Sequence, residues 1–474
     1  MKLYSIIKNI KCRNIGSTNL EISGLYHVDS QVKNNGLYFC IDGENFSGKN
    51  FVKNAVNNGA VAIVCEKEIE GLHCVTQIIV KNVRSAMSFM ACNFYGNPAK
   101  KLKIIGVTGT NGKTTTTYMI SSLINSAGKR CAIIGTNGVI YDNKNYQTEM
   151  TTPDPIVLQK IFKKMVKDKI EYVAMEVSAH AIYLDKLDGF KFELIIFTNL
   201  TEDHLDFFKT MNKYFEAKRK IFTGNHTARA LINIDDEFGL KLYQSINLEK
   251  YTYSICKPSD YFAKDIKYKN YKQTFTFDGK KFETNFLGTF NIYNLLATMG
   301  AVKILNLDDG NLVNNVKEIK QVPGRFNTIE KNGRLFIVDY AHTPDGLENV
   351  LLLCKGIVND KKLICVFGCG GNRETQKRSK MGEISSKFAD LSIITSDNPR
   401  FESRERIALD IQKGFLNNNY KIILDRAEAV GFAYKKSNFG DVILVAGKGA
   451  ENYIDEMGVK TKYSDFDVID KLDK

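Results

Sequence analysis

The 474-residue sequence predicts an α/β protein of three domains. Short apolar strands alternate with segments of helical periodicity, and this alternation begins afresh at three places along the chain. The length also suits about three domains of ordinary size. Several strands end in glycine or polar residues, as in open parallel sheets that bind ligands at the carboxyl ends of their strands. The expected domain limits are residues 1–100, 101–324 and 325–474.

The first domain is predicted to be a small α/β unit. The stretches "GLYFCIDG" from Gly36 and "GAVAIVCE" from Gly59 are short and apolar, as buried strands are. Between them, "NFVKNAVNNG" has helical spacing and closes on glycine. The unit ends near "NFYGNPAK", where Pro98 marks a boundary.

The second and third domains repeat the alternation with longer sheets. "KLKIIGVTG", "YVAMEVS" and "ELIIFTNL" are strands separated by helical stretches, which predicts a mostly parallel sheet with helices on both faces. After "VPGRF" (Val322–Phe326) the pattern restarts with "LFIVDY", "KLICVFG", "LSIITSDNP" and "DVILVAGKG". This last part is expected to form a Rossmann-like α/β domain.

The most informative stretch is "GVTGTNGKTTTT", residues 106–117. A strand ends, glycines let the backbone approach a polyphosphate, and a helix begins whose free N–H groups face the phosphates. Lys113 would neutralise charge on the terminal phosphates, and the Thr114 hydroxyl could bind Mg²⁺. The spacing is not the standard GxxxxGK[ST], because Val107 stands at the first glycine position. The form is still specific enough to predict ATP binding over a structural glycine turn.

Acidic and imidazole groups follow two strands of the second domain. Glu176 lies in "MEVSAH" and His204 in "NLTEDHLDF". Taken alone, each is more often a satisfied polar group than a ligand. Three of the six histidines, His180, His204 and His342, lie in such strand-end motifs. We therefore expect Glu176 and His204 to meet at one sheet edge beside the phosphate loop and hold a divalent cation.

Composition limits the partners and the compartment. The net charge is 66 − 53 = +13, which suits anionic ligands such as nucleotides and sugar diphosphates. The Lys and Arg residues are spread along the chain without a basic arm, which argues against nucleic acid. No apolar run approaches the roughly 18 residues of a membrane span. Ten scattered cysteines without a CxxC pair, and a start without a secretory signal pattern, predict a reduced, cytoplasmic protein, expected to be a monomer.

Eleven ordered motifs resemble the Mur ligases. They are "GVTGTNGKTT", "TTPD", "EVSAHA", "DHLDF", "YFEAKRKIF", "GTFNIYNLLA", "VPGRF", "DYAHTPDGL", "GCGGNR", "DNPR" and "AGKGAE". Together they are similar to the type that adds the third residue of the peptidoglycan stem peptide. "DSQVKNNGLYFCIDG" near the N-terminus is similar to the uridine-binding domain of that family. The resemblance covers nearly the whole chain.

The resemblance implies an ATP- and Mg²⁺-dependent amide ligase. ATP would phosphorylate the free carboxylate of UDP-MurNAc-L-Ala-D-Glu to an acyl phosphate, which the amine of a diamino acid attacks as phosphate leaves. Lys113 and magnesium would screen the anions that this step brings together. Lys218, in "YFEAKRKIF", matches the family's carbamylated lysine (N6-carboxylysine), an anion able to support a magnesium site. Without the family, Lys218 would be a solvated charge on an amphipathic helix.

The resemblance also assigns the substrate sites. The metal set is Thr114, Glu176, His204 and carbamylated Lys218, and the catalytic set is Lys113, Glu176, His204 and Lys218. The ATP-binding set is Gly109, Thr110, Asn111, Gly112, Lys113, Thr114, Thr115, Asn294, Arg325, Asp339 and His342. The set for the UDP-MurNAc-dipeptide is Ser30, Thr151, Thr152 and Ser178, whose hydroxyls could equally cap turns. Asn291 is left out because it could cap a helix.

"DNPR" (residues 397–400) matches the family members that select meso-diaminopimelate, whose side chain ends in a second amino acid head. Arg400 would offer a planar fork to the distal carboxylate, and Pro399 would restrict the loop. L-Lysine has no distal carboxylate, so its binding would leave Arg400 unpaired at a cost of about 2–5 kcal/mol. The diaminopimelate-binding set is Arg373, Asp397, Asn398, Pro399, Arg400, Gly447 and Glu451.

Departures and alternatives accompany this prediction. The chain departs from the usual family residues at Gln31, Leu184, Lys186 and Ala450 and in "GENFSG". The same ligation with L-lysine is one alternative, and a folylpolyglutamate synthetase-like ligase is another. A basic P-loop ATPase that binds nucleic acid, and a non-catalytic nucleotide-binding regulator, are further alternatives. The uridine-type first domain and "DNPR" favour the diaminopimelate-adding ligase.

Overall fold

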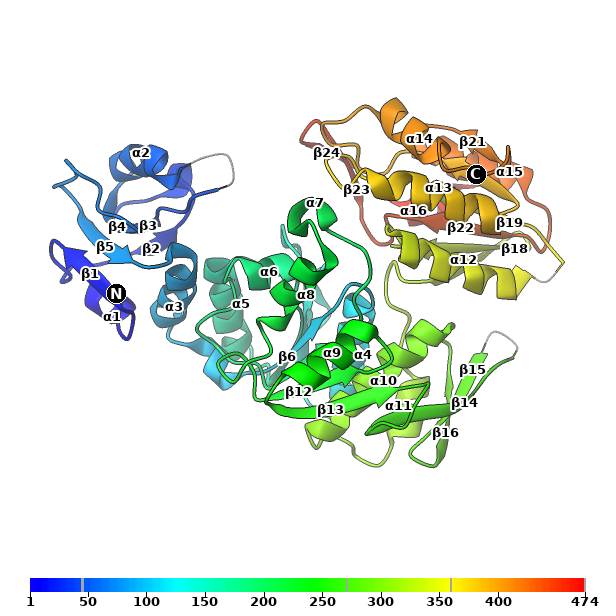
Figure 1. The fold of residues 1–474 in the computed structure, drawn as a ribbon, viewed down its shortest axis with the longest axis horizontal. Coiled ribbons are helices and arrows are strands. Elements are labelled where there is room, and N and C mark those ends of the chain that lie inside the picture. The colour runs from blue at the N-terminus through cyan, green and yellow to red at the C-terminus, as the bar shows by residue number, and fades with distance from the viewer. Residues whose placement is uncertain (44–46, 270–271, 359, 473–474) are drawn as a thin grey trace.

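The computed structural model describes residues 1–43, 47–269, 272–358 and 360–472, which form three α/β domains (Figure 1). The predicted departure "GENFSG" includes residues 44–46, which lie outside the described part of the chain. The three large sheets draw their strands from residues 12–80, 103–284 and 327–446. The predicted three-domain α/β architecture is therefore confirmed. The limits proposed at residues 100 and 324 fall between sheets.

The N-terminal domain has a five-stranded sheet in the order β1-β5-β4-β3-β2, parallel except between β1 and β5. Helix α3 begins where the Asn82 side chain accepts from the Ser85 N–H, and it ends at Gly96 in the left-handed region. Helices α1 and α3 pack on one face of the sheet and α2 on the other. The elements are α1 (Leu3–Ile6), β1 (Cys12–Ile15), β2 (Gly24–Tyr26), η1 (Asp29–Gln31), β3 (Gly36–Phe39), η2 (Gly48–Phe51), α2 (Val52–Asn57), β4 (Ala60–Cys65), β5 (Thr76–Val80), α3 (Val83–Tyr95) and η3 (Pro98–Lys101).

The central domain has an eleven-stranded sheet in the order β16-β15-β14-β13-β12-β11-β6-β10-β7-β8-β9. Its middle strands are parallel, and antiparallel hairpins extend both edges. The strands are β6 (Lys103–Thr108), β7 (Cys131–Gly135), β8 (Gly138–Tyr141), β9 (Lys144–Tyr146), β10 (Tyr172–Glu176), β11 (Leu194–Phe197), β12 (Arg229–Asn233), β13 (Glu249–Ser254), β14 (Tyr261–Lys269), β15 (Lys272–Phe277) and β16 (Lys280–Thr284).

Helices cover both faces of this central sheet, as the sequence predicts. Neighbouring strand residues divide between the two cores: Ile104 packs with α5, α6, α8 and α9, whereas Ile105 packs with α4, α10 and α11. The helices are α4 (Lys113–Ser126), α5 (Pro155–Lys167), α6 (Ala179–Tyr183), α7 (Leu205–Phe208), α8 (Met211–Arg219), α9 (Glu237–Ser245), α10 (Thr289–Ile304) and α11 (Leu312–Lys317).

The C-terminal domain has a six-stranded sheet in the order β17-β18-β22-β19-β20-β21, parallel except between β17 and β18. Helices α12, α13 and α14 pack on one face and α15 and α16 on the other, which confirms the predicted Rossmann-like layering. The elements are β17 (Asn327–Lys331), β18 (Arg334–Asp339), α12 (Pro344–Val358), β19 (Leu363–Phe367), α13 (Gln376–Phe388), β20 (Leu391–Ile394), α14 (Arg404–Gln412), β21 (Tyr420–Ile422), α15 (Arg426–Lys436), β22 (Val442–Ala446), the hairpin β23 (Tyr453–Glu456) and β24 (Val459–Lys462), and α16 (Asp465–Lys471).

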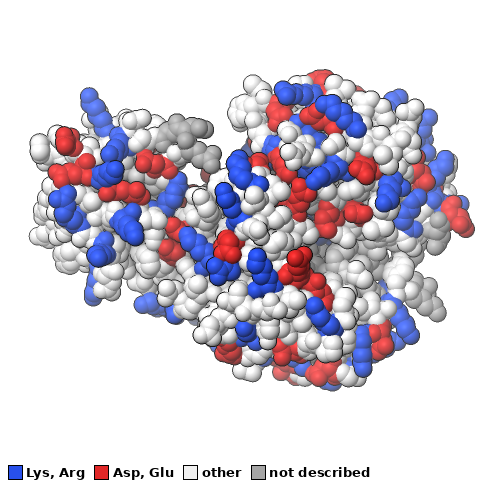
Figure 2. All heavy atoms as spheres, in the orientation of Figure 1, with Lys and Arg blue, Asp and Glu red and all other residues white. Residues whose placement is uncertain are grey.

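The spread of charged side chains and the state of the cysteines are consistent with what the composition predicts. Lys and Arg side chains are interspersed with Asp and Glu over the face seen in Figure 2, rather than gathered into one basic patch. All ten cysteines are free thiols. None of the helices in the described residues combines the length and apolar character needed to cross a bilayer.

Candidate active site

A cleft of about 590 Å³ is lined by residues of the central and C-terminal domains. Residues at or just after the carboxyl ends of strands in both sheets lie on the walls of this cleft. The predicted site residues that line it are Thr110, Asn111, Gly112, Lys113, Thr114, Thr115, Thr151, Glu176, Ser178, His204, Lys218, Asn294, Arg325, Asp339, His342, Arg373, Asp397, Asn398, Arg400, Gly447 and Glu451. Ser30, Gly109, Thr152 and Pro399 are outside this set of described lining residues.

The phosphate loop follows β6, which lies between β10 and β11 in the sheet. This strand order explains why the end of β10 and the loop after β11 flank the phosphate loop. Two glycines in it are required by close approach: a Cβ on Gly109 would lie 1.9 Å from Thr198 Oγ1, and one on Gly112 would lie 2.4 Å from Asn294 Oδ1. Both have positive φ, +147° and +86°. Helix α4 then begins at Lys113, so its free N–H groups face the cleft.

Two lysines converge on the carbonyl of Gly109. Lys113 Nζ donates to Gly109 O at 3.1 Å and to Thr110 O at 2.7 Å, and Lys218 Nζ donates to Gly109 O at 2.8 Å. Lys218 is only 1% exposed and lies 4.7 Å from the centre of the Tyr214 ring. Burial, and next the charge of Lys113, lower the pKa of Lys218 well below its ordinary value. The interpretation of Lys218 as a solvated charge is therefore wrong.

Glu176 and Thr114 meet beside the phosphate loop. Thr114 Oγ1 donates to Glu176 Oε1 at 3.0 Å, and the Thr136 N–H donates to the same oxygen at 2.8 Å. Arg325 Nη2 donates to Thr114 Oγ1 at 2.9 Å. A hydroxyl beside a buried carboxylate at a phosphate loop is the hard-oxygen donor set that Mg²⁺ prefers, so the residues fit the ion that the resemblance implies.

His204 also lines the cleft, from the loop after β11, on the other side of β6 from Glu176. It has a positive φ of +56°, its Nε2 is 3.4 Å from Asp203 Oδ2, and its ring is 4.9 Å from that of His180. Burial lowers the pKa of His204, so the imidazole is neutral near pH 7 and able to act as a ligand. Within the described residues no three His, Cys, Asp or Glu side chains lie close enough to hold a metal ion by themselves. A cation here would need hydroxyl, phosphate or carbamate oxygens as well.

Neighbouring groups hold several of the residues that the sequence predicts to bind the nucleotide. Arg325 stacks 4.4 Å from the centre of the Tyr340 ring, and Asp339 accepts from the Phe326 N–H at 2.7 Å and from the Ala341 N–H at 2.7 Å. The Asp339 carboxylate therefore holds the backbone at Phe326, in the interdomain linker between α11 and β17. The suggestion that Asn291 caps a helix is wrong: it lies inside α10 and donates to Leu287 O at 2.8 Å.

Burial, and next the charge of Lys377, lower the pKa of His342 to about 4, and Lys377 Nζ also donates to the His342 carbonyl at 3.0 Å. Sequence reasoning missed Lys377 and also Asp345, which accepts from Asn111 Nδ2 at 2.6 Å across the domain boundary. Asp345 stands inside the quoted motif "DYAHTPDGL", which is the signal that could have indicated it.

The predicted UDP-MurNAc-dipeptide residues are scattered. Thr151 and Ser178 line the cleft, and the Ser178 hydroxyl caps α6 by accepting from the Ala181 N–H. The Thr152 hydroxyl donates to Glu176 O at 2.9 Å and accepts from the Ser178 N–H at 3.0 Å, so local backbone groups already satisfy it. Ser30 is exposed on η1 of the N-terminal domain.

The "DNPR" loop lines the cleft from the C-terminal domain. Arg400 Nη1 donates to Gly371 O at 2.7 Å, so the guanidinium faces the glycine-rich loop after β19. Its backbone is fixed on the β23–β24 hairpin, because the Arg400 N–H donates to Asp455 O at 2.9 Å and the Met457 N–H donates to Arg400 O at 2.7 Å. These bonds hold a positive φ of +51° that a non-glycine residue rarely adopts. Pro399 is buried.

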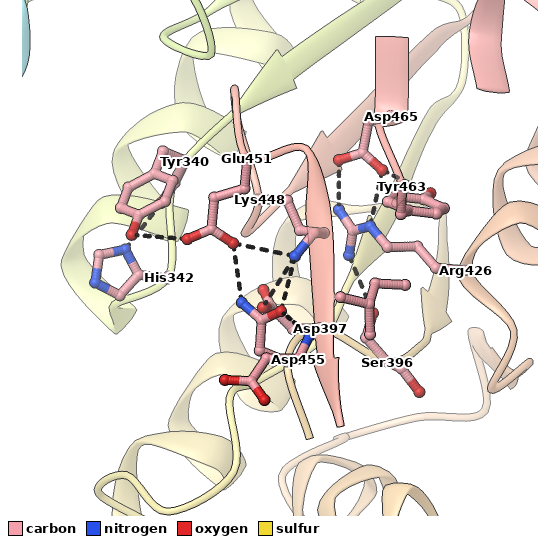
Figure 3. Close-up of polar contacts among 12 residues, drawn as sticks. Tyr340, His342, Ser396, Asp397, Arg426, Lys448, Glu451, Asp455, Tyr463 and Asp465 are labelled. Carbon is pink, nitrogen blue, oxygen red and sulfur yellow. Dashed lines mark hydrogen bonds and ion pairs between the residues drawn. The ribbon is translucent and has the colours of Figure 1, made fainter. Parts of the chain in front are cut away.

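Glu451 lines the same cleft as Arg400, and Figure 3 shows it between Tyr340 and Lys448. Its Oε1 accepts from the Tyr340 hydroxyl at 3.4 Å, and its Oε2 accepts from Asn398 Nδ2 at 2.9 Å and Lys448 Nζ at 3.0 Å. Sequence reasoning missed Lys448, although it stands inside the quoted motif "AGKGAE".

A phosphate loop and two lysines from the central domain, and ionic side chains from the C-terminal domain, line one cleft, as an ATP-dependent enzyme that joins two substrates requires. The chain belongs to the Mur ligase family. Family profiles described as the Mur ligase middle domain, the Mur ligase glutamate ligase domain, and the Mur ligase family catalytic domain match residues 107–302, 324–449 and 21–95.

Individual relatives agree with this assignment. The chain is 42% identical to the UDP-N-acetylmuramoyl-L-alanyl-D-glutamate–2,6-diaminopimelate ligase 1 of Clostridium acetobutylicum, over 98% of this chain and 97% of that protein. It is 38% identical to the corresponding ligase of Clostridium botulinum over the full length of both. A solved structure of a ligase of the same name superposes with a TM-score of 0.71 at 32% identity, covering 100% of this chain and 98% of the other.

A folylpolyglutamate synthase of Mycobacterium tuberculosis, complexed with ADP and AMPPCP, shares the fold only. Its TM-score is 0.65 at 14% identity, over 77% of this chain and 92% of that one.

Proposed function

We propose that this protein is an ATP-dependent, ADP-forming ligase that joins meso-2,6-diaminopimelate to UDP-MurNAc-L-Ala-D-Glu in peptidoglycan precursor synthesis. The observation that carries the proposal is the Arg400 guanidinium on the wall of the same cleft as the phosphate loop. The named activity of full-length relatives at 38–42% identity supports it. The lysine-adding alternative has no use for a guanidinium at this place.

The phosphate loop serves the first half of the reaction. The γ-phosphoryl group of ATP passes to the D-Glu carboxylate, giving an acyl phosphate, and the amine of diaminopimelate then attacks the acyl carbon as phosphate leaves. Lys113, now bonded to the carbonyls of its own loop, would exchange them for phosphate oxygens and stabilise their charge. The N-terminus of α4 supplies further N–H donors.

The metal set proposed here is Thr114, Glu176, His204 and Lys218 in its carbamylated form. When bound, Mg²⁺ neutralises phosphate charge and orients the transferred group. The buried Lys218 amine has a lowered pKa, so it is available as the free base that can add CO2, releasing one proton and forming an anionic carbamate. The carbamate would face Lys113 with an opposite charge in place of a like one.

We propose for the substrate-binding residues the roles that the sequence predicts. Asn294 and Arg325 lie where the nucleotide would cross from the phosphate loop to the linker, and Asp339 and His342 shape that linker. Thr151 and Ser178 are available to the dipeptide, whereas Thr152 would act through its backbone bonds and Ser30 through the N-terminal domain. We further propose that the enzyme is a cytoplasmic monomer. Its free thiols suit a reducing compartment, and light scattering after gel filtration tests its size.

The proposed activity is tested on the purified protein with ATP, UDP-MurNAc-L-Ala-D-Glu and meso-diaminopimelate. Phosphate release must require all three substrates, and mass spectrometry must find the dipeptide precursor increased by the mass of diaminopimelate less one water. Phosphate release that nucleic acid stimulates and that ignores the muramoyl dipeptide would instead favour the nucleic-acid ATPase.

Replacing Arg400 by alanine is expected to lower kcat/KM for diaminopimelate by roughly 100-fold, because a distal carboxylate that has left water then lacks its partner. Turnover with lysine, which has no such carboxylate, should change little. The exposed Arg406 on α14 gives a matched control, since Arg406→Ala removes the same charge from the same domain. An equal loss with both amino acids would mean that Arg400 does not read the distal carboxylate.

A further inference from the structure

Lys448, on the loop after β22, is a completely buried cation that reaches the loop after β20, and these two loops carry much of the proposed diaminopimelate site. One loop follows β20 and carries Asp397 and Asn398, and the other follows β22 and carries Glu451 (Figure 3). Lys448 itself does not belong to the described residues that line the cleft, whereas all three of these neighbours do. Lys448 can therefore act on the ligand only without contact, by positioning these neighbours and by its charge.

Among the described residues, the side chains that accept a hydrogen bond from Lys448 or form an ion pair with it belong to the proposed ligand set, and its Nζ also lies 5.5 Å from the centre of the Tyr453 ring. Its Nζ donates to Asn398 Oδ1 at 3.1 Å and to Glu451 Oε2 at 3.0 Å, and it lies 3.9 Å from Asp397 Oδ1. The Lys448 ammonium thus offsets part of the negative charge of Asp397 and Glu451, two carboxylates that line the cleft. Buried carboxylates without such a cation would repel the distal carboxylate of an incoming ligand.

Lys448 also fixes which way the Asn398 amide points. The amide oxygen accepts from Lys448 Nζ and from the Asp455 N–H at 2.9 Å, which leaves Nδ2 to donate to Glu451 Oε2 at 2.9 Å. This arrangement gives Asn398 a single orientation, because the reverse orientation would put an NH₂ group against two donors.

The loops around Lys448 are held from behind by a second buried pair. Arg426 and Asp465 are each 0–1% exposed and form an ion pair, with Arg426 Nε donating to Asp465 Oδ1 at 2.8 Å. Arg426 Nη2 also donates to Ala446 O at 2.9 Å, immediately before the loop that carries Lys448 (Figure 3). Arg426 Nη1 donates to Ser396 O at 3.4 Å, immediately before Asp397, so the pair holds both loops from behind without using Lys448.

We propose that Lys448 is a specificity-determining positioning residue that lets the acid-lined pocket accept a zwitterionic side-chain end and disfavours a purely cationic one. The inference rests on the proposed function. With Lys448 in place, Asp397 and Glu451 can meet the distal ammonium while a carboxylate binds Arg400 close by. Without it, the pocket becomes more negative by one unit, which favours an ammonium alone and opposes a carboxylate.

Three acceptors that differ only in the charge at the far end test this proposal. They are 2-aminopimelate, which keeps the distal carboxylate alone, meso-diaminopimelate, which has both groups, and L-lysine, which keeps the ammonium alone. The value of kcat/KM is measured for each with wild-type protein, Lys448→Met and Lys448→Gln. Lys448→Gln keeps a hydrogen-bond donor but loses the charge. Lys435→Met, on the exposed end of α15, is the matched control.

We expect both Lys448 variants to lose more activity with an acceptor the more negative the far end of its side chain is. The loss should be greatest with 2-aminopimelate and about tenfold with diaminopimelate, and turnover with lysine should be nearly unchanged, so that the diaminopimelate-to-lysine ratio falls about tenfold. The KM for diaminopimelate should carry most of the change, and Lys435→Met should match the wild type.

Two outcomes would overturn the proposal: an equal loss with all three acceptors, which marks a purely structural lysine, or wild-type selectivity in Lys448→Gln, which makes hydrogen bonding sufficient. Thermal unfolding of each variant shows whether the C-terminal domain is intact. A wild-type protein that does not use diaminopimelate at all would refute the proposed function instead.

Discussion

Lys218→Ala is expected to be nearly inactive, with phosphate release at least about 100-fold below the wild type, because an anion that supports the magnesium site is lost. Short carboxylic acids such as acetate should restore part of the activity, since the removed side chain leaves space for a carboxylate near Gly109 and Tyr214. The measurement is the rate of phosphate release with all three substrates, titrated with acetate.

The rescue separates a metal-supporting anion from a packing residue. Lys213→Ala, on the exposed face of the same helix α8, is the control and should behave as wild type with or without acetate. Full activity in Lys218→Ala would show the lysine to be a bystander. Inactivity that no carboxylic acid relieves would assign it to the packing of the phosphate loop.

Lys113→Met should lower kcat by about 100- to 1000-fold, the usual cost of removing one preorganised group that faces developing charge. Methionine keeps the length and apolar stem of the side chain, so α4 and the loop should remain folded. Steady-state rates at saturating ATP measure the loss, and calorimetric titration with a non-hydrolysable ATP analogue shows whether the nucleotide still binds.

The exposed Lys129 after α4 provides the comparison, since Lys129→Met removes an equal charge outside the cleft. Unchanged kcat in Lys113→Met, with weaker nucleotide binding alone, would contradict the assigned role. That result would mean that Lys113 helps to bind ATP in the ground state and does not stabilise the transition state.

The layered fold and the phosphate end of the site followed from local patterns. A buried strand that ends in glycines before Lys113 predicts both the strand β6 and the helix start behind it. Parallel strands end at one edge, so Glu176 and the loop of His204 were expected beside that loop, and the order β11-β6-β10 confirms it.

Other contacts depend on pairings that single-sequence patterns do not specify. Lys218 looked like a surface charge because burial of its helix face depends on Tyr214 and the distant Gly109. The contact of Lys448 with Asn398, 50 residues away, and the Arg426–Asp465 pair, 39 residues apart, are likewise not specified by local patterns. Glu451 is only three residues from Lys448, but their contact gives the lysine no role until Asn398 is placed beside it. The antiparallel hairpins at both sheet edges were not predicted either.

Comparing meso-diaminopimelate, L-lysine and L-ornithine as acceptors tests the central claim most directly. With ATP and UDP-MurNAc-L-Ala-D-Glu saturating, kcat/KM for diaminopimelate should exceed that for either of the others by at least about 30-fold, because only diaminopimelate pairs the Arg400 guanidinium. Equal values for the three amino acids, or a preference for lysine, would contradict the account.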